Sequence, residues 1–597
     1  MLKTLKKIAG VLSVGLMAIS PLSVYAEEQD SVIRILFTGN LRNHLGSTKQ
    51  RDPDTKELLS VGGYDRLYTT LQAETTESTL KIDMGNYSTG SGIYDCLYDS
   101  AESYTLLHKM GYDCVGTGER ELAYGTDRFI SMVNSTEEQP QVVASNLSGY
   151  DNTSTIIEKG GKQFGIFSVI SKTHALVLGE DVLENEKESA EKAVRELKDA
   201  DYTICLYDGT LEEGKQIAED VDGISLVLCA GEIDTTEKVE KVKDTLLVTG
   251  GAYGQTVGRL DLYGDTLKLK NYEVLEVNGE SNETMRALVN AYTDQAQSAL
   301  GVKLDTLAGH VQIDMDDPLL ADMSVSNTRT QDMVLDAYAD MYTSHADHQG
   351  SFAIAVSNKY SFKGGIYEGD IHLKELYDCA DIGSDDILYT AYIQGYDVKR
   401  LCELDHMYGD ANPLFKMAFS GVKYTYLDKR TKYNTVKDVY VEESRGYWAK
   451  MDNDKYYPIV FTDSFMKVLH ASSIVEDGIL QVRLYKSSTG EGEVTDSLED
   501  CVMKDSHDNI LTCMYSIKDF IQDAKRNSNA QHDITSAYSQ KDTCRTQEKL
   551  TLMNLISNPS EYAFHSYVYY GKAAAVIIVG LMIFTAVWNR CHPNRKG

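Results

Sequence analysis

Polar and charged side chains follow several apolar runs of this chain, at the places where predicted strands end. Asn40 and Arg42 come after the run Ile33–Phe37, and Asp208 comes directly after Tyr202–Tyr207. Because a layered α/β fold gathers its chemistry in the loops at strand ends, we expect these side chains to lie close together. Other polar residues of the same kind lie in the neighbouring loops, namely Asn86, Glu119, Arg120, Glu232 and Asp234.

Carboxylates and arginines in one place allow three interpretations. Carboxylate oxygens bind hard cations such as Ca²⁺ or Mg²⁺, which would make this a metal site. Arg42 and Arg120 cannot coordinate a metal, so they favour instead a cluster of salt bridges with the acids. A solvated acidic rim is the third interpretation. His44, the one histidine near the first loop, is expected at the surface or in a hydrogen bond rather than on a metal.

The order of the runs predicts a layered α/β domain over residues 27–280, because strand signals alternate with amphipathic stretches. Met285–Leu300 has apolar residues at helical spacing and no internal Gly or Pro, which predicts one connecting helix within residues 281–301. A second α/β domain is expected over residues 302–500. Residues 501–566 are polar and are predicted to form a flexible stalk.

Composition excludes some function classes. The formal charge of −32 argues against a nucleic-acid partner, because such a surface needs clusters of basic residues. Ten cysteines in 597 residues are too few for a disulfide scaffold, although Cys379 with Cys402, or Cys501 with Cys513, could pair. There is no CxxC, GxSxG, Walker A or HExxH motif, so no zinc knuckle, serine hydrolase, P-loop or zincin site is indicated.

Both ends of the chain carry targeting signals. Residues 1–26 have the basic start, apolar centre and small-residue exit of a secretory signal peptide. Ala573–Trp588 is free of charge over sixteen residues, and with the flanking tyrosines it predicts a transmembrane anchor over residues 567–589. Residues 590–597 are basic and are expected in the cytoplasm. We therefore expect an exported, single-pass protein of the cell membrane with an extracellular body; a buried C-terminal helix is the alternative.

The first domain resembles the calcineurin-like metallophosphoesterase domain of the 5'-nucleotidase family, whose members are exported enzymes that remove phosphate from nucleotides. "RILFTGNLRNHL" is similar to the family's "ILHTNDxHGHL", and "GGYDRL" to "GGxARL". Further along, "KIDMGN" is similar to "LDAGD", "GYDCVGTGERELAYG" to "GYDAMTLGNHEFDYG", and "CAGEID" to "GGHTH". The resemblance implies a four-layer sandwich, followed by a smaller α/β domain.

The resemblance also implies that the family's site has degenerated in this chain. The family binds two divalent metals, and a histidine oriented by an aspartate assists the reaction. Here the histidine aligns with Arg120 and the aspartate with Ala123. No metal cofactor is therefore expected, and a divalent metal on the remaining carboxylates is the alternative. The positions aligned with the metal ligands are Asn40, Arg42, Asn86, Glu119, Asp208, Glu232 and Asp234.

The second domain resembles the family's C-terminal substrate-binding domain. "NTRTQDMVLDAY" places Arg329 on a substrate-binding arginine, and "SNKYSFKGGI" places Asn358 on the binding asparagine and Lys363 on a second arginine. Of the two rings that the family stacks around the base, Phe465 is kept, and Phe415 lies one residue from the aligned position. These residues predict a nucleotide or nucleoside site.

Three hypotheses follow for the function. The first is a catalytically inactive, membrane-tethered protein of the 5'-nucleotidase type that binds a nucleotide or nucleoside or serves as a scaffold. The second is an active nucleotide or phosphoester hydrolase with an altered metal site. The third is a structural envelope protein that presents a surface to a protein partner, whose identity the sequence does not give.

Overall fold

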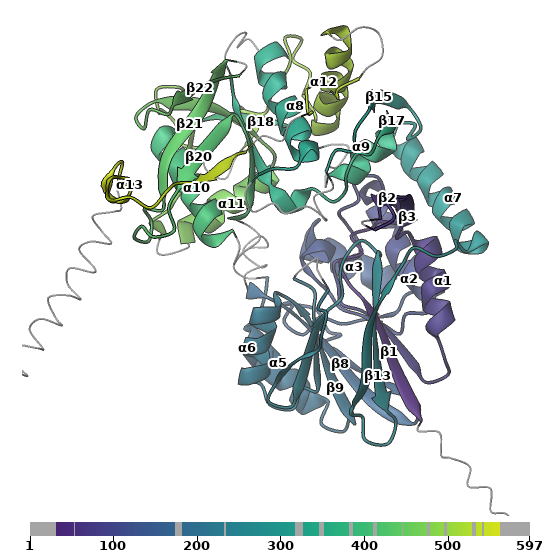
Figure 1. Ribbon diagram of the computed structural model, residues 1–597. Coiled ribbons are helices and arrows are strands. Elements are labelled where there is room, and N and C mark those ends of the chain that lie inside the picture. Colours follow the sequence, from purple (N-terminus) through teal and green to yellow (C-terminus); the bar gives the residue numbers. More distant parts are fainter. Residues whose placement is uncertain are drawn as a thin grey trace, which may run out of the picture.

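The computed structural model describes residues 31–560, except residues 53, 173–181, 232–234, 317–325, 346–351, 381–385, 410–414, 445, 475–477, 495–497, 528–532, 536 and 540–542. Figure 1 shows two domains: a lower one in purple to blue and an upper one in green to yellow, with the teal helix α7 (Glu283–Leu300) at their side. The predicted signal peptide, transmembrane anchor and cytoplasmic tail lie outside the described residues. Among the helices that are described, none combines the length and the apolar character needed to cross a bilayer.

The N-terminal domain contains two six-stranded sheets. The first has the order β14-β13-β1-β4-β5-β6, and its strands from β1 to β6 run parallel. The second has the order β11-β12-β10-β9-β8-β7. The strands of the first sheet are β1 Val32–Thr38, β4 Thr79–Asp83, β5 Cys114–Val115, β6 Gln141–Val142, β13 Thr256–Tyr263 and β14 Leu269–Glu276. Those of the second are β7 Ser154–Lys159, β8 Lys162–Ile170, β9 Tyr202–Asp208, β10 Leu226–Cys229, β11 Glu240–Val242 and β12 Thr245–Thr249.

Side-chain alternation along the strands explains why the two sheets stack. In β1, Ile33, Ile35 and Phe37 point into a core shared with the second sheet, whereas Leu36 packs in the cluster on the opposite face. Helices cover both outer faces, which gives the predicted four-layer sandwich. The helices over the first sheet are α1 Tyr64–Glu74, α2 Glu102–Met110 and α3 Thr126–Ser135, and those over the second are α5 Glu186–Glu196 and α6 Leu211–Asp220.

The C-terminal domain is also α/β. Its larger sheet has the order β19-β16-β23-β18-β24, and a four-stranded sheet has the order β22-β21-β20-β25. Its principal helices are α8 Arg329–His345, α9 Leu373–Cys379, α10 Gly395–Tyr408, α11 Ser464–Ile474 and α12 Cys513–Asn527. The larger sheet's strands are β16 Ile354–Asn358, β18 Tyr389–Gln394, β19 Met417–Ser420, β23 Tyr456–Phe461 and β24 Leu484–Tyr485. The others are β15 Leu307–Val311, β17 Gly369–His372, β20 Val422–Tyr426, β21 Val436–Ser444, β22 Tyr447–Lys450 and β25 Arg545–Gln547.

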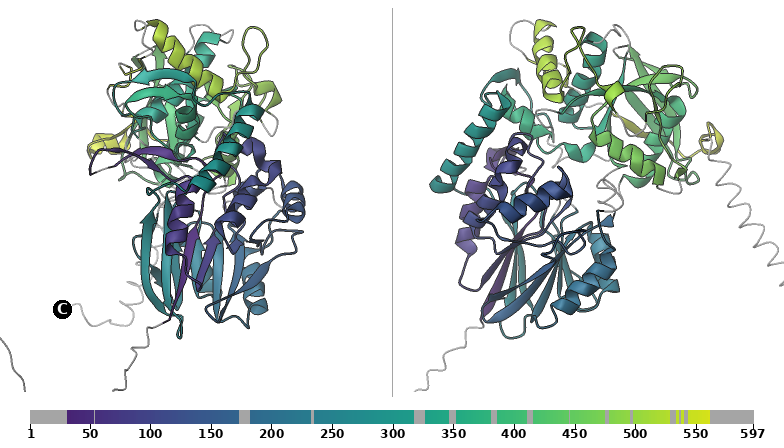
Figure 2. Two further views of the ribbon diagram at one scale, coloured as in Figure 1. Left: turned by 90° about the vertical axis from the view of Figure 1, so that its right-hand side faces the viewer. Right: turned by 180° about the vertical axis from the view of Figure 1, so that it is seen from behind.

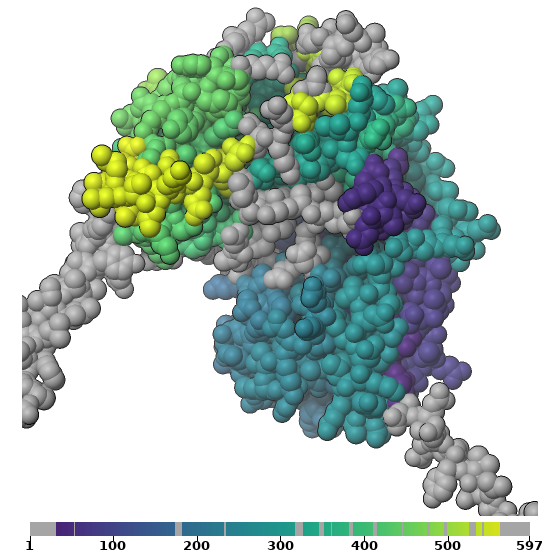
Figure 3. All heavy atoms as spheres, viewed as in Figure 1, coloured from purple at the N-terminus to yellow at the C-terminus, as the bar shows by residue number. Residues whose placement is uncertain are grey.

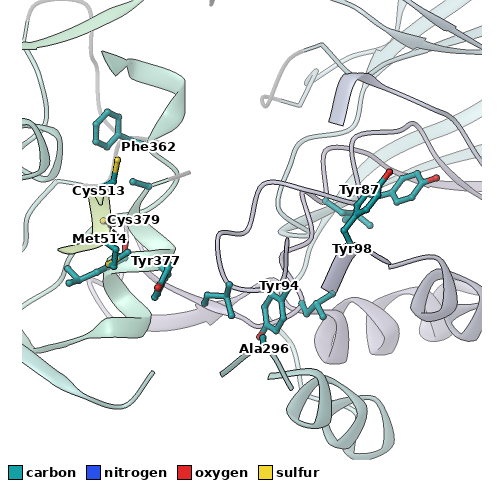
Figure 4. Packing of buried hydrophobic residues seen from close by; sticks show 14 of the residues in the cluster. Tyr87, Tyr94, Tyr98, Ala296, Phe362, Tyr377, Cys379, Cys513 and Met514 are labelled. Atoms are coloured by element: carbon teal, nitrogen blue, oxygen red, sulfur yellow. Dashed lines mark hydrogen bonds between the residues drawn. The ribbon is translucent and has the colours of Figure 1, made fainter. Parts of the chain in front are cut away.

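The helix predicted over Met285–Leu300 is present as α7, which packs against α1. One cluster of buried apolar residues continues past it from the N-terminal domain into the C-terminal domain. Figure 4 shows part of this cluster, with Tyr94 beside Ala296 of α7 and Tyr377 on the C-terminal side. Because apolar side chains from both domains are removed from water together, the interface contributes to stability.

The prediction of a flexible stalk over residues 501–566 is wrong for the part that is described. Helix α12 packs on α8, and its Ile517 and Ile521 are fully buried. Strand β25 adds to the four-stranded sheet by pairing with β20. Polar composition misled the prediction because the few apolar residues here fall at helical spacing and find tertiary partners. The nine described cysteines are free thiols, so neither candidate disulfide forms.

Candidate functional site

Two loops at adjacent strand ends of the first sheet are joined by backbone hydrogen bonds. The N–H of Asn40 donates to Gly85 O at 3.0 Å, and that of Arg42 donates to Asn86 O at 2.8 Å. Asn40, Arg42 and Asn86 all have left-handed backbones, with φ of 50°, 47° and 61°. Asparagine tolerates this conformation better than most residues with a Cβ, whereas for Arg42 it is unfavourable and persists because the surroundings impose it. The loops therefore hold three of the predicted site residues in one fixed place.

Asn86 is the centre of a buried network at this edge. Its side-chain N–H donates to Asp208 Oδ1 at 2.7 Å, and its side-chain oxygen Oδ1 accepts from the backbone N–H of Arg120 at 3.0 Å. The second oxygen of Asp208 accepts from the backbone N–H of Glu119 at 2.9 Å. Asp208 itself is fully buried at the end of β9. The structure thus brings together four of the positions that the sequence predicted.

The remaining predicted residues of this edge have separate partners. The side-chain N–H of Asn40 donates to the carbonyl oxygen of Ala230 at 2.8 Å, which ties the first loop to the second sheet. Arg42 donates to the Tyr253 hydroxyl at 3.2 Å and lies over that ring. Arg120 pairs with Glu119 at 3.6 Å. Ala123 follows the short 3₁₀ turn Glu119–Leu122, whereas Glu232 and Asp234 lie outside the described residues.

Glu121 has a central role at this sheet edge that the sequence did not predict. Its carboxylate accepts from the backbone N–H groups of Asn86, Tyr87, Ser88 and Gly118 at 2.7–3.0 Å, and from the Ser88 hydroxyl at 3.1 Å. Burial raises the pKa of Glu121, and the four N–H groups oppose that rise. A signal was present, since "GERELAYG" keeps a glutamate where "GNHEFDYG" also has one. The residue fixes the Asn86 loop against the Arg120 turn.

A second buried acid, Asp83, is the last residue of β4. Asp83 accepts hydrogen bonds from the Thr38 hydroxyl at 2.6 Å and from the Gly85 N–H at 2.9 Å. Burial raises the pKa of Asp83 well above its usual value, and these two donors oppose the change. Parallel pairing of β1 with β4 aligns Thr38 with Asp83, which explains their contact.

His44, which was expected at the surface or in a hydrogen bond, is buried. Its ring centroid lies 4.9 Å from that of Tyr253. Burial lowers the pKa of His44 well below its usual value, and the cations Lys363, Lys374 and Arg42 lower it further. The imidazole is therefore neutral at neutral pH.

Most of the predicted substrate-binding residues of the C-terminal domain are already engaged in hydrogen bonds, an ion pair or core packing. Lys363 is buried and donates to Gly90 O and Ser91 O of the N-terminal domain. Arg329 pairs with Asp316 at 3.2 Å, and Asn358 ends β16. Phe465 and Phe415 are each 1% exposed and belong to the domain's apolar core. In this conformation neither ring offers a face to a base.

Comparison with known proteins shows which proteins have a similar architecture. A family model described as "5'-nucleotidase, C-terminal domain" matches residues 308–467. The solved 5'-nucleotidase precursor of Thermus thermophilus is 16% identical, with a TM-score of 0.66, and the match covers 87% of this chain and 100% of that one. The chain has the fold of the two-domain 5'-nucleotidases. No curated protein matches its sequence.

Other solved structures share this 5'-nucleotidase fold at similarly low sequence identity. The sulfate thiohydrolase SoxB of Thermus thermophilus is 13% identical, with a TM-score of 0.63 over 87% of this chain and 97% of that one. The 5'-nucleotidase of Candida albicans is 13% identical, with a TM-score of 0.51 over 82% of this chain and 97% of that one. Since identities are this low, the likeness concerns the fold.

The fold implies a pair of divalent metals, and the described residues do not fit them. Asn86 and Asp208 use their polar atoms on each other and on backbone N–H groups. Arg42 brings a cation, and Asn40 directs its N–H to Ala230 O. Nowhere in the described ranges do three or more His, Cys, Asp or Glu residues gather as metal ligands. The 5'-nucleotidase-like edge is therefore organised by hydrogen bonds.

Proposed function

We propose that this protein is a non-catalytic scaffold with a 5'-nucleotidase fold, exported and tethered to the membrane by its C-terminus. The observation that carries the proposal is the contact of Asn86 with Asp208 at 2.7 Å, together with the Arg120 and Glu119 N–H groups that complete it. Side-chain atoms that already have hydrogen-bond partners inside the protein gain little free energy by binding a metal or a phosphate. The network stabilises the sheet edge rather than preparing it for hydrolysis.

The C-terminal domain supports a scaffold rather than a nucleotide-binding module. Lys363 joins the two domains, and Phe415 and Phe465 are core residues. A base would need to open this packing before it could stack between the rings. Export and tethering rest on the signal-peptide pattern of residues 1–26 and on the apolar run Ala573–Trp588.

Hydrolysis and metal content test the proposal directly. The purified full-length protein is incubated with Mn²⁺, Co²⁺, Zn²⁺ or Ca²⁺, then dialysed and analysed for metal, and phosphate release is followed from AMP, ATP and a generic phosphoester. We expect no bound metal at stoichiometric level and no release above buffer. Turnover that is abolished by Asp208→Ala, but kept by Asp199→Ala at an exposed position of the same domain, would establish an active hydrolase instead.

Nucleoside binding is the second candidate function, because the C-terminal domain matches its family model over residues 308–467. Titration calorimetry with adenosine and AMP distinguishes it from a scaffold. The scaffold proposal expects no heat of binding. Saturable heat that disappears in Phe465→Ala, while the variant keeps its unfolding transition, would favour the binding module.

A further inference from the structure

Four large apolar side chains are exposed together near the end of the described chain. Leu550, Leu552, Met553 and Ile556 are 62%, 77%, 69% and 61% exposed. The last three lie in the short helix α13 (Leu552–Ile556). We refer to these four residues as the C-terminal apolar patch. A set of exposed apolar residues this dense marks a contact surface, whereas single exposed ones are ordinary.

The backbone that carries the patch is fixed to the C-terminal domain. Arg430 donates from Nε to Asn554 O at 3.0 Å and from Nη1 to Asn558 O at 3.4 Å, and it also contacts Ser557 O. The N–H of Ser560 donates to the side chain of Asn434 at 2.6 Å. At the start of the helix, the Thr551 side chain accepts from the Asn554 N–H. The patch is thus presented outward by an ordered segment. Figure 3 shows that segment as the yellow band at the left edge of the molecule.

We propose that the C-terminal apolar patch inserts into the outer surface of the lipid bilayer. The inference rests on the proposed tether. Ten residues, 557–566, separate Ile556 from the predicted anchor at residues 567–589, so the eleven-residue rise from Ile556 to Tyr567 spans at most about 40 Å when extended. The start of that anchor contains Tyr567, Tyr569 and Tyr570, and Tyr562 lies between Ile556 and the anchor. Tyrosine is enriched at the level of lipid headgroups.

The size and charge of the surface favour lipid over a protein. A stable protein interface uses about 20–30 residues on each side, and this patch has four. Leu, Met and Ile side chains need only enter the boundary between headgroups and acyl chains to leave water. The formal charge of −32 repels anionic lipid, so the surface addressed is a neutral, zwitterionic one held by apolar contact.

Insertion would orient the body. Helix α13 lies on the outer side of the C-terminal domain, away from the N-terminal sheets, as Figure 1 and the right-hand view of Figure 2 show. With α13 at the bilayer, the C-terminal domain lies next to the membrane. The N-terminal domain then lies farther from the membrane.

Depth-sensitive fluorescence tests the inference on the full chain in phosphatidylcholine vesicles. Leu552→Trp and, as matched control, Leu307→Trp, which is 51% exposed on β15, are made in a background that lacks both native tryptophans through Trp448→Phe and Trp588→Phe. Brominated lipid should quench the tryptophan introduced at position 552 about threefold more than the one at position 307. Ile556→Trp should behave like Leu552→Trp, and should lose the extra quenching when Leu552→Glu and Met553→Glu are added.

Flotation with the vesicles separates this inference from the tether. If the protein floats and both positions are quenched equally, the tether stands and insertion of the patch is overturned. Equal quenching together with a dimer in detergent would assign the patch to a second copy instead. If the protein does not float, the tether and the insertion fail together.

Discussion

The ammonium group of Lys363, in the C-terminal domain, donates hydrogen bonds to Gly90 O at 2.8 Å and Ser91 O at 3.2 Å in the N-terminal domain. Lys363 is 1% exposed. A cation that the sequence assigned to substrate therefore joins the two domains. Nearby, Lys374 donates to Ser47 O at 2.9 Å, and Arg51 pairs with Asp314 across the same interface.

Lys363→Met should weaken the interface between the domains. A buried hydrogen bond to a charged group contributes about 1.5–3 kcal/mol, and this change leaves two carbonyl oxygens without their donor. We expect the free energy of unfolding in urea to fall by about that amount, or the transition to split as the domains separate. Lys49→Met is the control, because its pair with Glu375 at 3.2 Å also crosses the interface but Lys49 is 52% exposed. Equal small effects of both changes would contradict the assignment.

Asn86→Ala should destabilise the N-terminal domain more than its size suggests. The change removes the donor to Asp208 and the acceptor for the Arg120 N–H, both inside the protein. Each buried polar group left without its partner costs about 1–3 kcal/mol. Asn271→Ala, at an exposed position of β14, should cost less than about 0.5 kcal/mol. Urea unfolding of the two variants measures the difference, and equal midpoints would show that the network carries no stability.

The sequence predicted the sandwich because alternation along strands such as Ile33–Phe37 records which face is buried. It also placed Asn40, Asn86 and Asp208 close together, because the strands of the two stacked sheets end on the same side of the domain. It could not show that Lys363 reaches Gly90, because that contact depends on how the domains meet. Nor could it show that Arg545 is buried, since its partner Asp405 lies 140 residues away.

Glu102 should make the protein less stable as the pH rises. Burial raises the pKa of Glu102 from 4.5 to about 7, while the hydrogen bond from the Asn43 side chain at 3.0 Å opposes the shift. The folded state therefore holds a proton that the unfolded state has lost between about pH 4.5 and pH 7. Across that window the group should remove on the order of 3 kcal/mol of stability, and the loss persists at higher pH.

Glu102→Gln isolates this effect from the other buried acids. The amide keeps an oxygen for Asn43 but cannot ionise, so the variant should lose less stability than the wild type between pH 4.5 and pH 8. Urea unfolding at several pH values gives the difference curve. Glu196→Gln, at an exposed position of α5, should follow the wild type. A difference curve that is flat for Glu102→Gln would mean that Glu102 reaches water when charged.

Arg545→Met decides whether residues 543–560 are part of the C-terminal domain or a tail. Burial would raise the pKa of Asp405, but Arg545 at 2.7 Å, the Tyr424 hydroxyl and the Met417 N–H together hold it below the usual value. Without Arg545 the buried carboxylate is uncompensated, which costs about 3–5 kcal/mol.

The loss from Arg545→Met should be greatest at neutral pH and smaller at pH 4, because without the arginine Asp405 can take up a proton in the folded state. Adding Asp405→Asn should recover part of it. Lys504→Met removes an exposed pair with Asp508 and should cost at most about 1 kcal/mol. If Arg545→Met and Lys504→Met unfold at the same urea concentration, β25 contributes nothing to the stability of the domain. The ordered support of the C-terminal apolar patch would then be lost with it.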